Sequence, residues 1–160
     1  MPTFPILTEP TPSLRKRSEE VETREITTPA FQAFIDTLTR TMFVEDGIGI
    51  ASPQVGKNIR VIIVNLKEGA SCFINPELTK VSDAMIESEE GCLSVPGRSG
   101  IVKRHKRVSV KALNRHGRRV ELDLSGLMAI VFQHEIDHLD GILYIDKAIK
   151  IVDHRKAFSL

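Results

Sequence analysis

The stretch Gln133-His134-Glu135-Ile136-Asp137-His138-Leu139-Asp140-Gly141 decides how the rest of the chain must fold. Its two histidines, four positions apart, project from the same side of a helix, and the glutamate beside the first reaches the same neighbourhood. This H-E-x-x-H pattern suits a divalent metal ion with a carboxylate base next to it. Two histidines leave a tetrahedral shell incomplete, so a further protein ligand must come from elsewhere in the chain.

The helix that carries this stretch is predicted to follow Ser125 as its N-cap and to end at Gly141 in a left-handed conformation. Apolar residues occur nearly all round it, so we expect it to be buried on most sides. Burying two imidazoles and a carboxylate in such a helix is costly unless a metal ion compensates. The pattern therefore favours a metal site over two structural histidines.

Strand patterns occupy the middle of the chain, ahead of the final helix. An extended arm with one helical turn is expected for residues 1–27, and Thr28-Pro29 predicts the start of a helix that ends before Gly47. Strands are predicted at residues 60–65, 72–76, within 78–88, and in a hairpin around 114–117; residues 142–160 are expected to add a strand or a short helical turn. Because the strands form a block, we predict a single α+β domain over residues 1–160, with antiparallel sheets around the buried helix.

Bulk composition excludes several classes of function. A chain of 160 residues with a net charge of +1 has the size of one domain and is too balanced for a general nucleic-acid or membrane binder. It has no apolar run of about 18 residues, and its start lacks a signal or transit pattern. We therefore expect a cytoplasmic protein whose two cysteines, Cys72 and Cys92, stay reduced.

The identity of the third protein ligand distinguishes the known classes of H-E-x-x-H protein. Thermolysin-like enzymes use a downstream glutamate, but no glutamate follows Glu135, and the metzincin pattern needs a histidine where this chain has Tyr144. His154 remains a downstream candidate. The strongest soft ligand lies upstream at Cys92, beside a glycine, and would give a Cys-His-His shell with one position open for water.

Three stretches of the chain resemble the three signature motifs of peptide deformylases in the same order. Residues 47–54 resemble GΦGΦAAPQ, residues 90–94 match EGCLS, and residues 133–138 match QHEΦDH. Residues 6–15 and 74–77 are also similar to that family, so the resemblance covers most of the chain.

The resemblance implies a role for each matching position. These roles are metal ligands at Cys92, His134 and His138, a general acid/base at Glu135, and donors to the oxyanion at Gln54 and the backbone amide of Leu93. One divalent metal ion is implied, Fe(II) physiologically, with zinc, nickel or cobalt in the isolated protein. The implied reaction removes formate from N-formylmethionyl nascent peptides, and the implied fold is the α+β arrangement expected above.

The substrate is predicted to lie against one face of the same helix. An apolar slot for the methionine side chain is expected from Ile48 together with Leu127, Ile130 and Val131, although these residues can equally be core. The alternation of glycine and isoleucine at 47–50 lets backbone approach a ligand, a crossing strand or a bulge. Through Ile48 and Gly49 this edge is predicted to pair with an extended peptide.

The chain departs from the family pattern at a few positions. Ser52 replaces the usual second alanine, and Arg98 stands one position earlier than the arginine of many members. The long basic C-terminal helix of many bacterial members is missing, so at most a weak ribosome contact is expected. The basic run at 103–107 is expected to be a solvated face, and no specific nucleic acid is predicted as a partner.

Two other functions remain as alternatives. One is a small H-E-x-x-H metalloendopeptidase, and the other is a metal-binding module without catalytic activity. A module without activity should have lost Glu135, Gln54 or a ligand, and none is lost.

Overall fold

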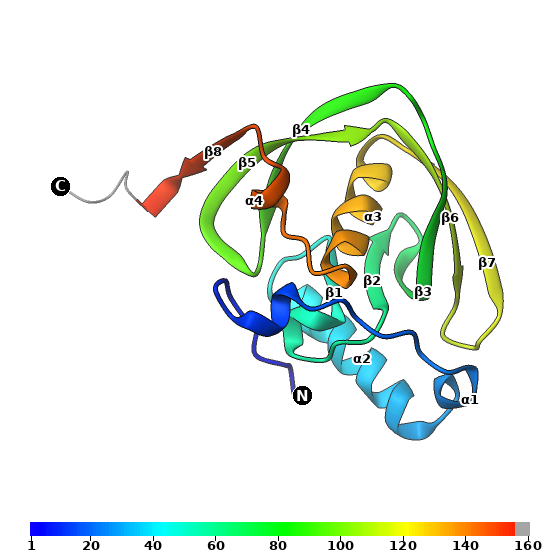
Figure 1. Ribbon diagram of the computed structural model, residues 1–160. Coiled ribbons are helices and arrows are strands. Elements are labelled where there is room, and N and C mark those ends of the chain that lie inside the picture. Colours follow the sequence, from blue (N-terminus) through cyan, green and yellow to red (C-terminus); the bar gives the residue numbers. More distant parts are fainter. Residues whose placement is uncertain (156–160) are drawn as a thin grey trace.

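Two antiparallel sheets surround one long helix in the computed structural model, which describes residues 1–155 (Figure 1). The large sheet has the strand order β1-β2-β3-β6-β7 and the small sheet has the order β4-β5-β8. The strands are β1 (Gly49–Ala51), β2 (Val61–Leu66), β3 (Gly69–Val81), β4 (Met85–Cys92), β5 (Val95–His105), β6 (Arg107–Leu113), β7 (Arg119–Ser125) and β8 (Lys150–Asp153). The helices are α1 (Thr23–Ile26), α2 (Pro29–Val44), α3 (Gly126–Leu139) and α4 (Tyr144–Lys147), with 3-10 turns η1 (Pro12–Arg15) and η2 (Ser52–Val55). The predicted α+β class is confirmed.

The large sheet is covered on both faces, which explains the unbroken β-branched run in β2. Ile62 and Val64 belong to the apolar cluster that includes α3, whereas Val61 and Ile63 belong to the cluster that includes α2. Successive side chains of a strand point to opposite faces, so a strand between two helices must be apolar at every position. Strand β2 thus fixes α3 and α2 on opposite sides of the large sheet.

Helix α2 begins as the sequence predicts. The Thr28 hydroxyl accepts a hydrogen bond from the Phe31 amide at 3.3 Å, and a proline occupies the first turn. The helix ends at Val44, before Gly47.

Helix α3 ends as expected but begins differently. Gly141 adopts a φ of 75°, and a Cβ there would lie 2.3 Å from the Arg15 carbonyl oxygen, so both conformation and space require glycine. Ser125 precedes the helix, but its side chain makes no capping hydrogen bond. Burial on nearly all sides is wrong for the first turn: Leu127 is 58% exposed because it faces a cavity.

The small sheet has its own apolar cluster, formed with α4. Its buried members are Val95, Val102, Leu143 and Tyr144. The expected strand and short helical turn after residue 142 are both present, as β8 and α4, although residues 156–160 lie outside the described part of the chain. Within residues 1–155 no helix has the length and apolar character needed to cross a membrane.

Candidate metal centre

Helix α3 and strand β4 bring the three predicted ligands together. The ligand atoms of Cys92, His134 and His138 all lie within 4.8 Å of one another, and the Cys92 Sγ is 3.3 Å from the His138 Nε2. Cys92 ends β4, just after a register shift against β5 that re-aims this end of the strand. The downstream candidate His154 lies elsewhere, with its Nε2 2.8 Å from the Ser99 hydroxyl.

The donor set fits one divalent cation. The Nδ1 of His134 lies 2.8 Å from the Glu90 Oε1, and donation through that nitrogen leaves Nε2 as the free donor atom. The Nδ1 of His138 is buried and has no hydrogen-bond partner among residues 1–155. One thiolate and two imidazoles form a set that suits zinc, iron, cobalt or nickel.

The surroundings of the two histidines shift their pKa values in opposite directions. Burial alone would lower the pKa of His134, but its hydrogen bonds to Cys92 and Glu90 raise the pKa to about 10. Burial, reinforced by the charge of His134, places the pKa of His138 well below its ordinary value. His138 is therefore kept neutral, the form in which an imidazole nitrogen can bind a metal ion.

Glu135 projects from α3 beside the ligands, with only 5% of its surface exposed. Burial raises the pKa of its carboxyl to about 7, although the charge of His134 opposes the shift. Its Oε2 has no hydrogen-bond partner within the described part of the chain. A carboxyl that titrates near neutrality with a free oxygen is suited to accept and return a proton.

Gly49 makes a close approach that was not among the alternatives left open by the glycine-isoleucine pattern. A Cβ at this position would lie 2.7 Å from the Glu135 Oε1, closer than real Cβ atoms approach. The missing side chain therefore lets β1 approach the carboxylate of Glu135, and not merely another strand.

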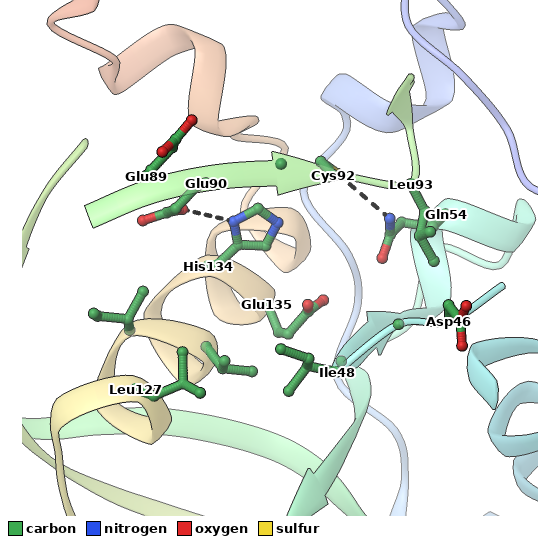
Figure 2. Close-up of a pocket in the computed structure, with 15 residues that line it drawn as sticks. Asp46, Ile48, Gln54, Glu89, Glu90, Cys92, Leu93, Leu127, His134 and Glu135 are labelled. Atoms are coloured by element: carbon green, nitrogen blue, oxygen red, sulfur yellow. Dashed lines mark hydrogen bonds and ion pairs between the residues drawn. The ribbon is translucent and has the colours of Figure 1, made fainter. Parts of the chain in front are cut away.

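Gln54 turns its amide nitrogen toward the ligands. Its Oε1 accepts a hydrogen bond from the Ala51 amide at 2.9 Å, which fixes the orientation of the amide. Its Nε2 is 3.2 Å from the Ser94 hydroxyl. The same nitrogen is 3.6 Å from the Cys92 Sγ (Figure 2). The donor end of Gln54 thus faces the cavity, which Leu93 also lines.

A cavity of about 390 Å³ opens next to these residues. The predicted substrate-binding residues all line it, namely Ile48, Gly49, Leu127, Ile130 and Val131. In Figure 2, Ile48 and Leu127 lie on the side of Glu135 away from Cys92. Ile48 is 47% exposed at the cavity wall. Val131 also belongs to the apolar cluster around α3, so for this residue the core interpretation is confirmed.

Three charged residues of the site received no role from the sequence. Arg104 is 2% exposed and contacts Glu90 and Asp137, both also buried. Hydrogen bonds from Arg104 and His134 outweigh the effect of burial and lower the pKa of Glu90 to about 2. The prediction of a solvated basic face at 103–107 is therefore wrong for Arg104. Positions 100, 102 and 104 of β5 alternate inward, and this alternation is the signal that indicates the burial of Arg104.

The remaining departures are accommodated locally. The Arg98 Nη2 lies 3.3 Å from the Glu9 Oε2, and the buried Ser52 hydroxyl donates to the Ile59 carbonyl. Cys72 and Cys92 are both free thiols, and burial raises the pKa of Cys72 to about 12.

Comparison with known proteins gives one consistent family. The polypeptide deformylase family model matches residues 3–154. A peptide deformylase from Halothermothrix orenii is 46% identical over 144 residues, covering 88% of this chain and 90% of the relative. The crystal structure of peptide deformylase from Thermotoga maritima matches with a TM-score of 0.88 at 36% identity, covering 94% of this chain and all of that one. The Met-Ala-Ser-bound class I type b peptide deformylase from Acinetobacter baumannii matches with a TM-score of 0.87 at 35% identity, covering 91% and 98%.

Proposed function

Because this chain belongs to the polypeptide deformylase family, we propose that Cys92, His134 and His138 hold the metal ion of its active site. The protein is a metal-dependent hydrolase that removes the formyl group from the N-formylmethionine of nascent polypeptides. One observation supports the residue assignment above all others: three ligand atoms within 4.8 Å of one another stand beside a buried carboxylate.

The metal proposed for the cell is Fe(II), and zinc, nickel and cobalt are the alternatives for the isolated protein. One thiolate with two imidazoles is compatible with each of these ions. When bound, such an ion would supply Lewis acidity, the chemistry that makes water a nucleophile near neutral pH.

Glu135 is proposed to move the proton. Its Oε2, free of other partners within residues 1–155, accepts a proton from the attacking water and delivers it to the leaving amine nitrogen as the formyl C–N bond breaks. A pKa raised to about 7 suits both halves of this transfer. Formate and a free methionine amine are the products.

Gln54 and the backbone amide of Leu93 are proposed to donate hydrogen bonds to the oxyanion. The bond from Ala51 to the Gln54 Oε1 fixes the opposite end of that amide before substrate arrives. Donors held in place in advance need no reorganisation during the reaction, and one such donor is typically worth about 3 kcal/mol.

The methionine side chain is proposed to occupy the apolar part of the cavity. This part is lined by Ile48, Leu127, Ile130 and Val131. The edge of β1 at Gly49 would pair with the peptide backbone, so binding should tolerate varied residues after methionine. The Met-Ala-Ser-bound structure of the A. baumannii relative supports a short peptide as ligand of such a site.

A cytosolic location and a weak ribosome contact complete the proposal. Nascent chains are the substrate, so the enzyme should act where they emerge. Lys103, Lys106 and Arg107 are exposed around the turn from β5 to β6, as expected for a solvated basic face.

The test is formate release from formyl-Met-Ala-Ser after reconstitution with ferrous or nickel ion without oxygen. We expect release of formate. A longer unformylated peptide should not be cleaved internally, because internal cleavage would indicate a metalloendopeptidase. Cys92→Ser should lower both metal content and activity, whereas Cys72→Ala, which removes the other thiol, should keep both. Unchanged metal content and activity in Cys92→Ser would exclude Cys92 as a ligand.

A further inference from the structure

Helix α3 is joined to the small sheet through polar side chains. The Gln133 amide makes two hydrogen bonds to the backbone of His105 on β5, each of 2.9 Å. The buried apolar cluster of the small sheet draws its described members from β5, α4 and the residue before α4, and none from α3. The position of this sheet relative to the helix therefore depends on directional contacts.

Arg104 is the most buried of these contacts and touches three elements at once. From β5, its Nε and Nη2 donate to the two carboxylate oxygens of Glu90 on β4 at 2.9 and 2.8 Å. Its Nη1 donates to the Asp137 Oδ2 on α3 at 2.6 Å. A planar guanidinium can serve two carboxylates in fixed directions, which an ammonium group cannot do.

Both carboxylates lead directly to the proposed ligands. Glu90 precedes Cys92 by two positions on β4, and its Oε1 also lies 2.8 Å from the His134 Nδ1. Asp137 immediately precedes His138 on α3. Arg104 is thus linked to the strand that carries the thiolate and to the helix that carries both imidazoles.

We propose that Arg104 is a positioning residue for the metal centre, holding the Cys92 strand and the helix of His134 and His138 at the separation that one shared ion requires. The inference rests on the ligand set of the proposed function. Metal–ligand distances tolerate only about 0.2 Å of change, so a small shift between β4 and α3 alters the site. Loss of Arg104 would also leave Glu90 and Asp137 as buried carboxylates without their shared cation.

The experiment compares Arg104→Met with Lys147→Met in the cobalt-loaded 160-residue chain. Met removes the charge of Arg104 and keeps an unbranched side chain. Lys147 donates to Asp137 at 3.0 Å but is half-exposed and does not contact Glu90, so its variant controls for losing one cation beside Asp137. We expect Arg104→Met to weaken cobalt binding by about tenfold to a hundredfold, and to shift the thiolate-to-cobalt and d–d absorption bands. Lys147→Met should keep both.

A change of spectrum separates positioning from a purely structural role. Circular dichroism shows whether Arg104→Met is folded. If the folded variant has unchanged absorption bands and a cobalt affinity within twofold of the parent protein, the proposal is overturned. If Arg104→Met does not fold, Asp137→Asn removes the charged link to α3 without changing shape, and the same two readouts decide. An unaltered parent protein that lacks a thiolate-to-cobalt band would instead refute the ligand set.

Discussion

The two sides of helix α3 are held by different forces. Toward the large sheet it presents Ala129, Phe132 and Ile136, which belong to the main apolar cluster. Toward the small sheet it presents Gln133 and Asp137, which form hydrogen bonds to β5. Apolar burial is strong but without direction, whereas hydrogen bonds fix orientation. One side of the helix therefore supplies stability and the other supplies geometry. Of the proposed site residues, His134 is linked to Glu90 on the small sheet, whereas Glu135 lies against Gly49 on β1 of the large sheet.

The largest expected effect is on the deformylation rate, from substitution of Glu135. This residue belongs to α3 but is not part of its apolar side. Glu135→Ala should lower the deformylation rate by about 10²- to 10⁴-fold because proton transfer is lost. Metal content should stay at the level of the parent protein, because Glu135 is not among the three clustered ligands. Formate release and metal analysis measure the two quantities.

Glu135→Gln serves as the matched variant, since it keeps the shape of the side chain beside Gly49. It should lose activity to a similar extent. Substantial deformylation by either variant would remove Glu135 from its assigned role.

The next largest effect is expected on the apolar side of α3. The ring of Phe132 is fully buried and packs edge-on against Phe73, with centroids 4.9 Å apart. Phe132→Ala should lower the free energy of unfolding by about 3 to 5 kcal/mol through lost contacts and a residual cavity. Leu127→Ala, at a position 58% exposed on the same helix, should change it by less than about 1 kcal/mol. Denaturant unfolding measures both, and equal losses would contradict the assignment of the stabilising contacts of α3 to its side toward the large sheet.

The smallest expected effect is a difference in alkylation between the two cysteine thiols, one in each sheet. Cys72 on β3 is buried and its pKa is raised to about 12, so at pH 8 its thiolate fraction is on the order of 10⁻⁴ and alkylation should be negligible. Cys92 on β4 lines the cavity and should react with iodoacetamide in the metal-free protein, and less after loading with metal. Mass spectrometry of the two peptides reports each site, and modification of Cys72 in the native protein would show that its surroundings open.

Much of the site was predictable because its residues lie in short local patterns. The spacing of His134 and His138 on one helix places them together without any knowledge of the rest of the fold. Cys92 was the strongest soft ligand while His154 stayed open as a candidate, and its role as a ligand was implied by the resemblance of its motif. Strand β2 and helix α2 were predictable for the same reason, since period and capping are local properties. Ser125, by contrast, fits the N-cap pattern but forms no cap, because capping depends on side-chain orientation as well as residue type.

The sequence by itself supplied the groups of the proposed site, namely a cysteine, two histidines and a glutamate with known spacing along the chain. Only the tertiary structure decided how these groups are held. Arg104 lies 14 positions from Glu90 and 33 from Asp137, so the network they form arises from the packing of β5, β4 and α3. Such contacts have no local signature: Arg104 sits in a basic run typical of an exposed surface, and only the alternation of β5 turns it inward.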